Sequence, residues 1–152
     1  MSKNNEIILG LQAIVTGLSQ QATGHMIQSR MFASQGFLKL AKKYAEHTEE
    51  EQKYVTLCID RLLDLGADIK NEAKQETPVF RDILEWIKYD LKISKEGLPW
   101  LAKIMEAAKC DVSTFDMLKD YYKDEEEDMY WAEQQLELIE KIGLQNWMAM
   151  QI

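Results

Sequence analysis

Apolar residues recur every three to four positions through four long stretches of the chain, the spacing that one buried face of an α-helix requires. The most regular stripe contains Phe115, Leu118, Tyr122, Glu125, Met129, Ala132, Leu136 and Ile139. The pattern predicts helices over about residues 5–33, 37–65, 78–109 and 113–141, and a short fifth helix over about 144–151. Helices of about 40 Å can bury their apolar faces only against one another.

The segments between these stretches indicate how the helices connect. Gly36 follows the first stretch, Gly66 follows the second, and a polar segment then runs to Thr77. Short connections join antiparallel helices, whereas a polar segment of about ten residues is long enough to cross a bundle. The chain 1–152 is therefore predicted to be one all-α domain, a four-helix bundle with one long crossover.

The helix ends carry local signals of their own. Thr77 is the expected cap of the third helix with Pro78 in its first position, Ser113 is the expected cap of the fourth, and Gly143 is expected to end it. Pro99 lies inside the third helix, where a proline removes one hydrogen bond and crowds the preceding turn. A kink or a break is therefore predicted near Gly97.

Composition narrows the range of partners and compartments. The 18 Lys and Arg against 26 Asp and Glu give a net charge of −8, which disfavours nucleic acid and anionic membranes as partners. Cys58 and Cys110 stand far apart with no metal-ligand spacing, which favours reduced thiols and a cytoplasmic protein. No leader peptide or membrane span is expected, because no apolar run is long enough.

Polar residues on the core stripes are the candidates for chemistry. Glu51 and Glu125 lie on two of these stripes, and an unpaired buried carboxylate costs several kcal/mol. Asp128 is one turn from Glu125, and His25 lies on the first stripe. These four residues are predicted as metal ligands; the alternatives are acids that are protonated or bonded to a tyrosine, and a histidine that only packs. His47 is expected to face solvent.

Several segments resemble the bacterioferritins of the ferritin-like superfamily. They are Arg30-Met31-Phe32, Asp124-Glu125-Glu126 followed by Trp131, and above all Ile142-Gly143-Leu144-Gln145-Asn146-Trp147. The resemblance covers nearly the whole chain. It implies a ferritin-like four-helix bundle with a short C-terminal fifth helix. It also implies a homo-oligomer, a hollow octahedral shell of 24 subunits that stores iron as a ferric mineral.

The chain departs from the ligand set of that family's two-iron ferroxidase centre. The resemblance places Leu18 and Ser94 where the family has glutamates, and Tyr54 and Asp128 where it has histidines. Glu51 and Glu125 alone are retained. The missing carboxylates and imidazoles predict a degenerate centre with weak or no activity, so no residue is assigned a catalytic role.

Two further expectations follow from the resemblance. Gln52 stands where the family's haem methionine lies, and an amide is a poor ligand for haem iron, so no haem is expected. Glu46 and Glu50 are one turn apart and would face the shell's cavity, where paired oxygen ligands can nucleate ferric oxide; the alternative is a pair that only aids solubility.

Three functional hypotheses remain open. The first and favoured one is a storage subunit whose iron is oxidised elsewhere, or by a partner subunit with the complete ligand set. The second is an active ferroxidase with a rearranged site. The third is a structural or binding bundle without iron chemistry. Oligomerisation is expected because many apolar residues fall outside the core stripes: Phe37, Trp86, Trp131, Trp147, Met148 and Met150.

Overall fold

The fold is known from a computed structural model that describes residues 3–152. The described chain contains helices and no strand, as predicted. The helices are α1 (Lys3–Ser34), α2 (Leu38–Asp64), α3 (Ile83–Ala107), α4 (Val112–Ile142) and the short α5 (Leu144–Ala149).

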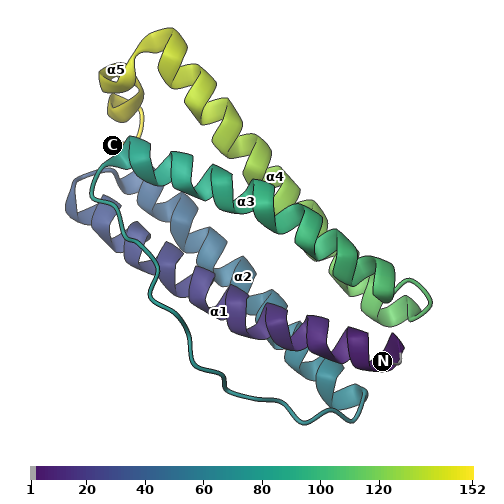
Figure 1. The fold of residues 1–152 in the computed structure, drawn as a ribbon. Helices are drawn as coiled ribbons and strands as arrows, with labels where there is room; N and C mark the ends of the chain where they lie inside the picture. The colour runs from purple at the N-terminus through teal and green to yellow at the C-terminus, as the bar shows by residue number, and fades with distance from the viewer. Residues whose placement is uncertain (1–2) are drawn as a thin grey trace.

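The helices form two antiparallel hairpins, α1 with α2 and α3 with α4, which pack into one bundle (Figure 1). The connection 65–82 leaves α2 at one end of the bundle and returns to the start of α3 at the other. It is the long crossover that the polar segment predicted. Helix α5 folds back at the end of α4, beside the loop that joins α1 to α2.

Helix α3 begins later than predicted. Its N-cap is Asp82, whose carboxylate accepts a hydrogen bond from the backbone N–H of Glu85 at 3.0 Å. Residues 77–80 lie outside the helix, so the placement of Thr77 as cap and Pro78 as first helical residue was wrong. A proline fits the first turn of a helix, but it fits an extended connection equally well.

The N-cap of α4 also differs from the prediction. Asp111 rather than Ser113 caps this helix, and its Oδ1 accepts from the backbone N–H of Thr114 at 3.2 Å. The end of α4 was predicted correctly, because Gly143 adopts φ +85° and terminates the helix.

Pro99 does not break α3, which continues through it to Ala107. Pro99 is exposed, and so is Lys95 one turn earlier, whose carbonyl loses its helical donor. Water can reach that carbonyl on the outer side of the helix. The predicted break near Gly97 is therefore absent.

The core consists of two apolar clusters, one toward each end of the bundle. One is built around Leu11, Ile14, Leu18, Cys58 and Leu118. The other is built around Phe32, Tyr44, Trp86, Ile87 and Trp147. On all four long helices the residues between the two clusters include polar side chains, among them His25 and Glu51, so a polar layer separates two dry layers.

Two tryptophans expected outside the core belong to it. Trp86 is 3% exposed and Trp147 is fully buried, where its Nε1 donates to Gln135 Oε1 at 2.9 Å. The docking of α5 buries Trp147, an arrangement that no helical stripe predicts. Large apolar side chains that remain exposed include Leu38, Trp100, Val112 and Ile152. No helix in the described range is both long and apolar enough to cross a membrane.

Candidate metal centre

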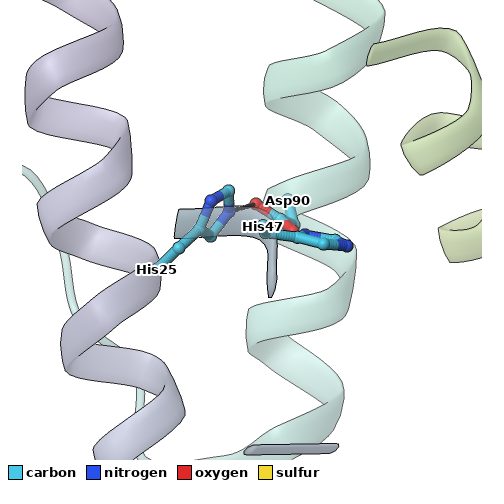
Figure 2. A group of neighbouring side chains, drawn as sticks. All are labelled: His25, His47 and Asp90. Carbon is cyan, nitrogen blue, oxygen red and sulfur yellow. Dashed lines mark hydrogen bonds and ion pairs between the residues drawn. The ribbon is translucent and has the colours of Figure 1, made fainter. Parts of the chain in front are cut away.

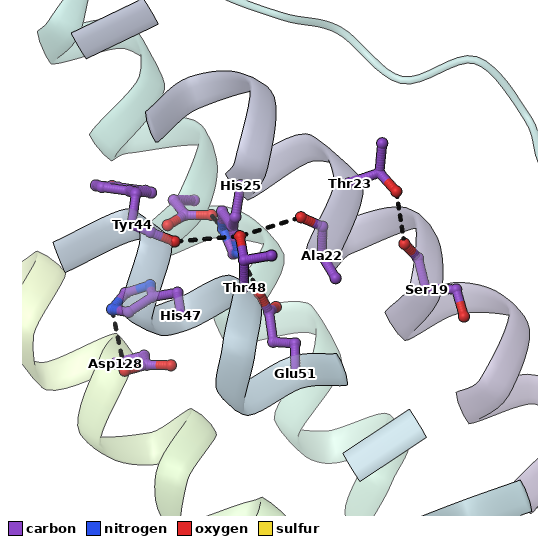
Figure 3. A network of polar contacts seen from close by, with 10 residues as sticks. Ser19, Ala22, Thr23, His25, Tyr44, His47, Thr48, Glu51 and Asp128 are labelled. Carbon is purple, nitrogen blue, oxygen red and sulfur yellow. Dashed lines mark hydrogen bonds and ion pairs between the residues drawn. The ribbon is translucent and has the colours of Figure 1, made fainter. Parts of the chain in front are cut away.

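His25 joins three helices in the polar layer. Its Nδ1 lies 2.6 Å from Glu51 Oε1 on α2, and its Nε2 lies 2.7 Å from Asp90 Oδ1 on α3. One turn away, the Thr48 hydroxyl lies 3.2 Å from the Ala22 carbonyl oxygen, which further ties α2 to α1 (Figure 3). The position of the His25 ring is thus fixed from both sides.

The charge of His25 follows from these two contacts. Burial lowers the pKa of the imidazole, but the carboxylates of Asp90 and Glu51 outweigh burial and raise that pKa well above its ordinary value. Both ring nitrogens then carry hydrogens and donate, one to each carboxylate. The resulting imidazolium cation offsets the negative charge of Glu51 and Asp90 in the metal-free protein.

His47 is buried at 4% exposure, so the expectation that it faces solvent was wrong. Neither of its ring nitrogens has a hydrogen-bond partner among the described residues, and Nε2 lies 3.5 Å from Asp128 Oδ1. Burial and the positive charge of His25 lower the pKa of His47 to about 3. His47 is therefore neutral at pH 7 and retains a free lone pair.

His25, His47 and Asp90 come together from three helices as a group whose side chains could bind a metal ion (Figure 2). One ligand atom from each lies within 4.8 Å of the other two. Tyr44 and Trp86 stand against the His25 ring, with ring centroids 5.5 and 6.4 Å away. These aromatic rings keep one side of the group dry, which strengthens electrostatic interactions inside it.

Helix α4 contributes two acids to the polar layer. Burial and the nearby Glu51 and Asp128 raise the pKa of Glu125 well above its ordinary value. Burial and the negative charges of Glu50 and Glu51 raise the pKa of Asp128 to about 7. Such acids either hold protons or attract a cation. Glu125 lines a pocket of about 160 Å³ that Leu18 also lines.

Tyr54 occupies the place at which the resemblance implies a histidine, and its side chain contacts α4. Its hydroxyl donates a hydrogen bond to Asp124 Oδ2, and its ring packs on Tyr121 with centroids 5.1 Å apart. Burial and Asp124 raise the pKa of the Tyr54 hydroxyl. The phenol therefore stays neutral and serves as a link between α2 and α4.

An open depression rich in acidic residues lies on the surface of the bundle between α2 and α4, and His47 is among the residues that line it. Glu46 and Glu50 line it together with Glu127 and Asp128, and its volume is about 460 Å³. Burial and a hydrogen bond with Asp124 raise the pKa of Glu50 to about 7. Gln52, which stands where the resemblance places the haem methionine, is an exposed residue of α2.

Of the four predicted ligands, the structure pairs His25 with Glu51 and sets Asp128 against His47, while Glu125 lies beside the Leu18 pocket. The prediction missed His47 and Asp90. A signal for His47 was present in the sequence, because it stands three residues after Tyr44 and four before Glu51, on the buried side of the same helix.

Comparisons with known proteins agree with the fold. A family model described as "Ferritin-like domain" matches residues 9–142. A protein named bacterial ferritin from Pseudomonas aeruginosa is 33% identical over the whole of both chains, and one from Synechocystis is 30% identical over 96% of each. A bacterioferritin from Streptomyces coelicolor is 24% identical over 94% of this chain and 87% of its own length.

Proposed function

This chain belongs to the ferritin-like domain family, and we propose on that premise that it is a subunit of an iron-storage shell with weak or no ferroxidase activity of its own. The observation that carries the proposal is the acidic layer inside the bundle, where burial raises the pKa of Glu51, Glu125 and Asp128, and the charge of Glu51 raises the pKa of the other two further. A fold that needed only stability would gain by replacing such acids with apolar residues. A role in handling cations explains why they are there.

The weak activity follows from the ligands. The two-iron centre that the resemblance implies needs four carboxylates and two imidazoles to offset and hold two ferrous ions. Leu18 is a buried apolar side chain, and Tyr54 bonds to Asp124. The residues at these positions therefore supply too few carboxylates and too few imidazole nitrogens to hold two ferrous ions near each other.

Storage would take place on the acidic depression of α2 and α4. Glu46 and Glu50 line it, and ferric iron prefers hard oxygen ligands of this kind. We propose that this surface faces the cavity of a closed shell of 24 chains. Oxidation then proceeds on growing mineral, or in a partner subunit with the complete ligand set.

Assembly would cover side chains that the single chain leaves exposed. Val112 is 76% exposed, Ile152 is 68% exposed and Leu38 is 62% exposed. Large apolar side chains exposed at both ends of the bundle would be covered in a closed assembly. We propose further that the shell works in the reducing cytoplasm with both cysteines as free thiols, and that it binds no haem because Gln52 offers only an amide.

Anaerobic loading of the purified protein with ferrous iron, followed by air, tests the proposal. We expect particles of 24 chains of 17.7 kDa each, iron retained within them, and oxidation that begins slowly and accelerates as mineral accumulates. The double variant Glu46→Gln, Glu50→Gln should assemble normally and accumulate mineral later. A stable monomer, or particles that retain no iron, would contradict the proposal.

An active ferroxidase with a rearranged site is a second candidate, favoured by the grouping of His25, His47 and Asp90. The same experiment separates the two candidates. A ferroxidase shows a fast initial phase with a fixed iron stoichiometry, whereas a storage subunit without a working centre shows only the slow phase.

A further inference from the structure

We propose that His25, His47 and Asp90 bind one divalent transition-metal ion at a site distinct from the positions of the family's two-iron centre. The three side chains come from α1, α2 and α3, and their ligand atoms lie within 4.8 Å of one another (Figure 2). Both histidines are 4% exposed. The proposal does not depend on iron storage.

The unpartnered ring of His47 points to a ligand. A buried imidazole normally donates one hydrogen bond and accepts another, yet neither nitrogen of His47 has a hydrogen-bond partner among the described residues. Its ring lies 5.6 Å from the ring of His25, centroid to centroid. A metal ion bound between the two rings would satisfy one nitrogen of His47 without any other group having to approach.

The orientation of His25 suits a metal ligand. Glu51 Oε1 lies 2.6 Å from Nδ1 and accepts its hydrogen, so Nε2 is aimed at Asp90. This carboxylate–histidine arrangement is the one that fixes metal-bound imidazoles in proteins. On binding, the ion takes the place of the proton between Nε2 and Asp90 Oδ1, and that proton leaves to solvent. Glu51 is thus a positioning residue.

The site is displaced along the bundle from the family positions. His25 lies two turns after Leu18 on α1, His47 lies two turns before Tyr54 on α2, and Asp90 lies about one turn before Ser94 on α3. Because α2 runs opposite to α1, all three displacements point toward the end of the bundle that holds the α1–α2 loop (Figure 1).

A path to the site opens between α1 and α3. A pocket of about 150 Å³ reaches His25 and Asp90, and two glycines of α1, Gly17 and Gly24, line it. No heavy atom lies within 4 Å of where a side chain would begin on either glycine. The missing side chains leave room for a hydrated ion to approach.

The donor set selects the class of ion. Two imidazoles and one carboxylate suit Zn²⁺, Co²⁺ or Fe²⁺, whereas Mg²⁺ and Ca²⁺ prefer sites made of oxygen alone. The positive charge of His25 lowers the pKa of Glu51, Glu125 and Asp128 against the effect of their burial, so a divalent ion bound beside His25 would favour the charged carboxylates in the same way.

Cobalt titration of the assembled, chelator-treated protein tests the site. We expect visible d–d bands that saturate at one Co²⁺ per chain, and competition for that site by Zn²⁺ but not by Mg²⁺. His47→Ala and Asp90→Asn should abolish the bands, and Glu51→Gln should weaken binding by about 10–100-fold and shift them. The matched control is the surface variant Asp116→Asn, which removes an exposed carboxylate near the start of α4 and whose bands should be those of the wild type.

A second measurement on the wild type avoids dependence on variants that fail to fold. X-ray absorption of the zinc-loaded wild type should show two imidazoles bound to the metal. Wild-type protein without cobalt bands, an absorption spectrum without imidazole, or bands that vanish in the surface variant would each overturn the proposal. These outcomes are separate from whether the shell stores iron, because they are read with cobalt and zinc alone.

Discussion

His25 Nδ1 lies 2.6 Å from Glu51 Oε1, a contact between α1 and α2 that is almost fully buried. Removing one partner of such a pair leaves the other charge without compensation in the core, at a cost of about 3–5 kcal/mol. We expect His25→Leu to lower the thermal unfolding midpoint of the metal-free protein strongly. Calorimetry at pH 7 measures this shift.

The double variant His25→Leu, Glu51→Leu is the control. It removes both members of the pair and fills their space with apolar atoms, so part of the lost stability should return. If the double variant is no more stable than His25→Leu, the pair is not the source of the effect.

Asp111 links the start of α4 to α2 and should make stability depend on acid. Its carboxylate accepts from Thr114 and, at 2.9 Å, from Arg61 Nη2. Burial tends to raise the pKa of Asp111, but the Thr114 hydrogen bonds and the charge of Arg61 outweigh it and lower that pKa. The contribution is therefore complete above the unfolded-state pKa of about 3.9 and is lost as the pH falls through the lower folded-state value.

We expect Asp111→Ala to cost about 1–2 kcal/mol near neutral pH, because both the cap and the ion pair disappear. Asp111→Asn should retain part of the cap. Unfolding measured from pH 7 down to pH 2 should show the gap between wild type and Asp111→Asn constant above pH 5 and closing in acid. If the difference in unfolding free energy between wild type and Asp111→Asn grew as the pH fell, the carboxylate would not have a lowered pKa in the folded protein, and the prediction would be contradicted.

The glycines of α1 should respond oppositely to alanine. Gly17 has open space around it, so Gly17→Ala should stabilise the helix by about 0.5–1 kcal/mol. At Gly10 a new Cβ would lie 2.7 Å from Cγ2 of Ile104, a stiff β-branched side chain, so Gly10→Ala should destabilise. Thermal midpoints of the two variants test the contrast, and equal shifts would argue against it.

The two thiols should differ sharply in reactivity. Cys58 is fully buried, and burial raises its pKa to about 12, whereas Cys110 is exposed. A thiol reagent at pH 8 should therefore modify one cysteine per chain rapidly and the second only after denaturation. Cys110→Ser should remove the fast reaction and Cys58→Ser should leave it unchanged.

The four long helices could be predicted from the sequence because their apolar stripes are long and regular. The crossover could be predicted because its segment is polar and lacks an apolar stripe. The prediction for His47 was wrong although its spacing from Tyr44 and Glu51 marks the buried side of the helix, since Glu46 beside it suggested an exposed position. Neighbours on a helix point about 100° apart, so an exposed Glu46 says little about His47. Asp90 was missed because its meeting with His25 depends on the packing of α3 against α1, which periodicity does not specify.

The last prediction concerns iron oxidation. A ferroxidase must hold two ferrous ions close enough for oxygen to bridge them, using carboxylates to offset their charge and nitrogens to fix them. Leu18 and Ser94 remove two carboxylates from the positions that the resemblance implies. We therefore expect wild-type protein to oxidise ferrous iron little faster than free solution does, until mineral surface accumulates.

We expect that substitutions can build the two-iron centre implied by the resemblance into this chain. Leu18 borders the pocket of about 160 Å³ that Glu125 also lines, so a glutamate at 18 has room to face that acid. The combined change Leu18→Glu, Tyr54→His, Ser94→Glu and Asp128→His should create a fast initial phase that consumes about two irons per subunit. Stopped-flow absorbance measures it, with Leu18→Gln in the same background as the control that lacks one charge. A wild type that already shows this phase, and loses it in Glu51→Ala or His25→Ala, would establish the rearranged ferroxidase instead.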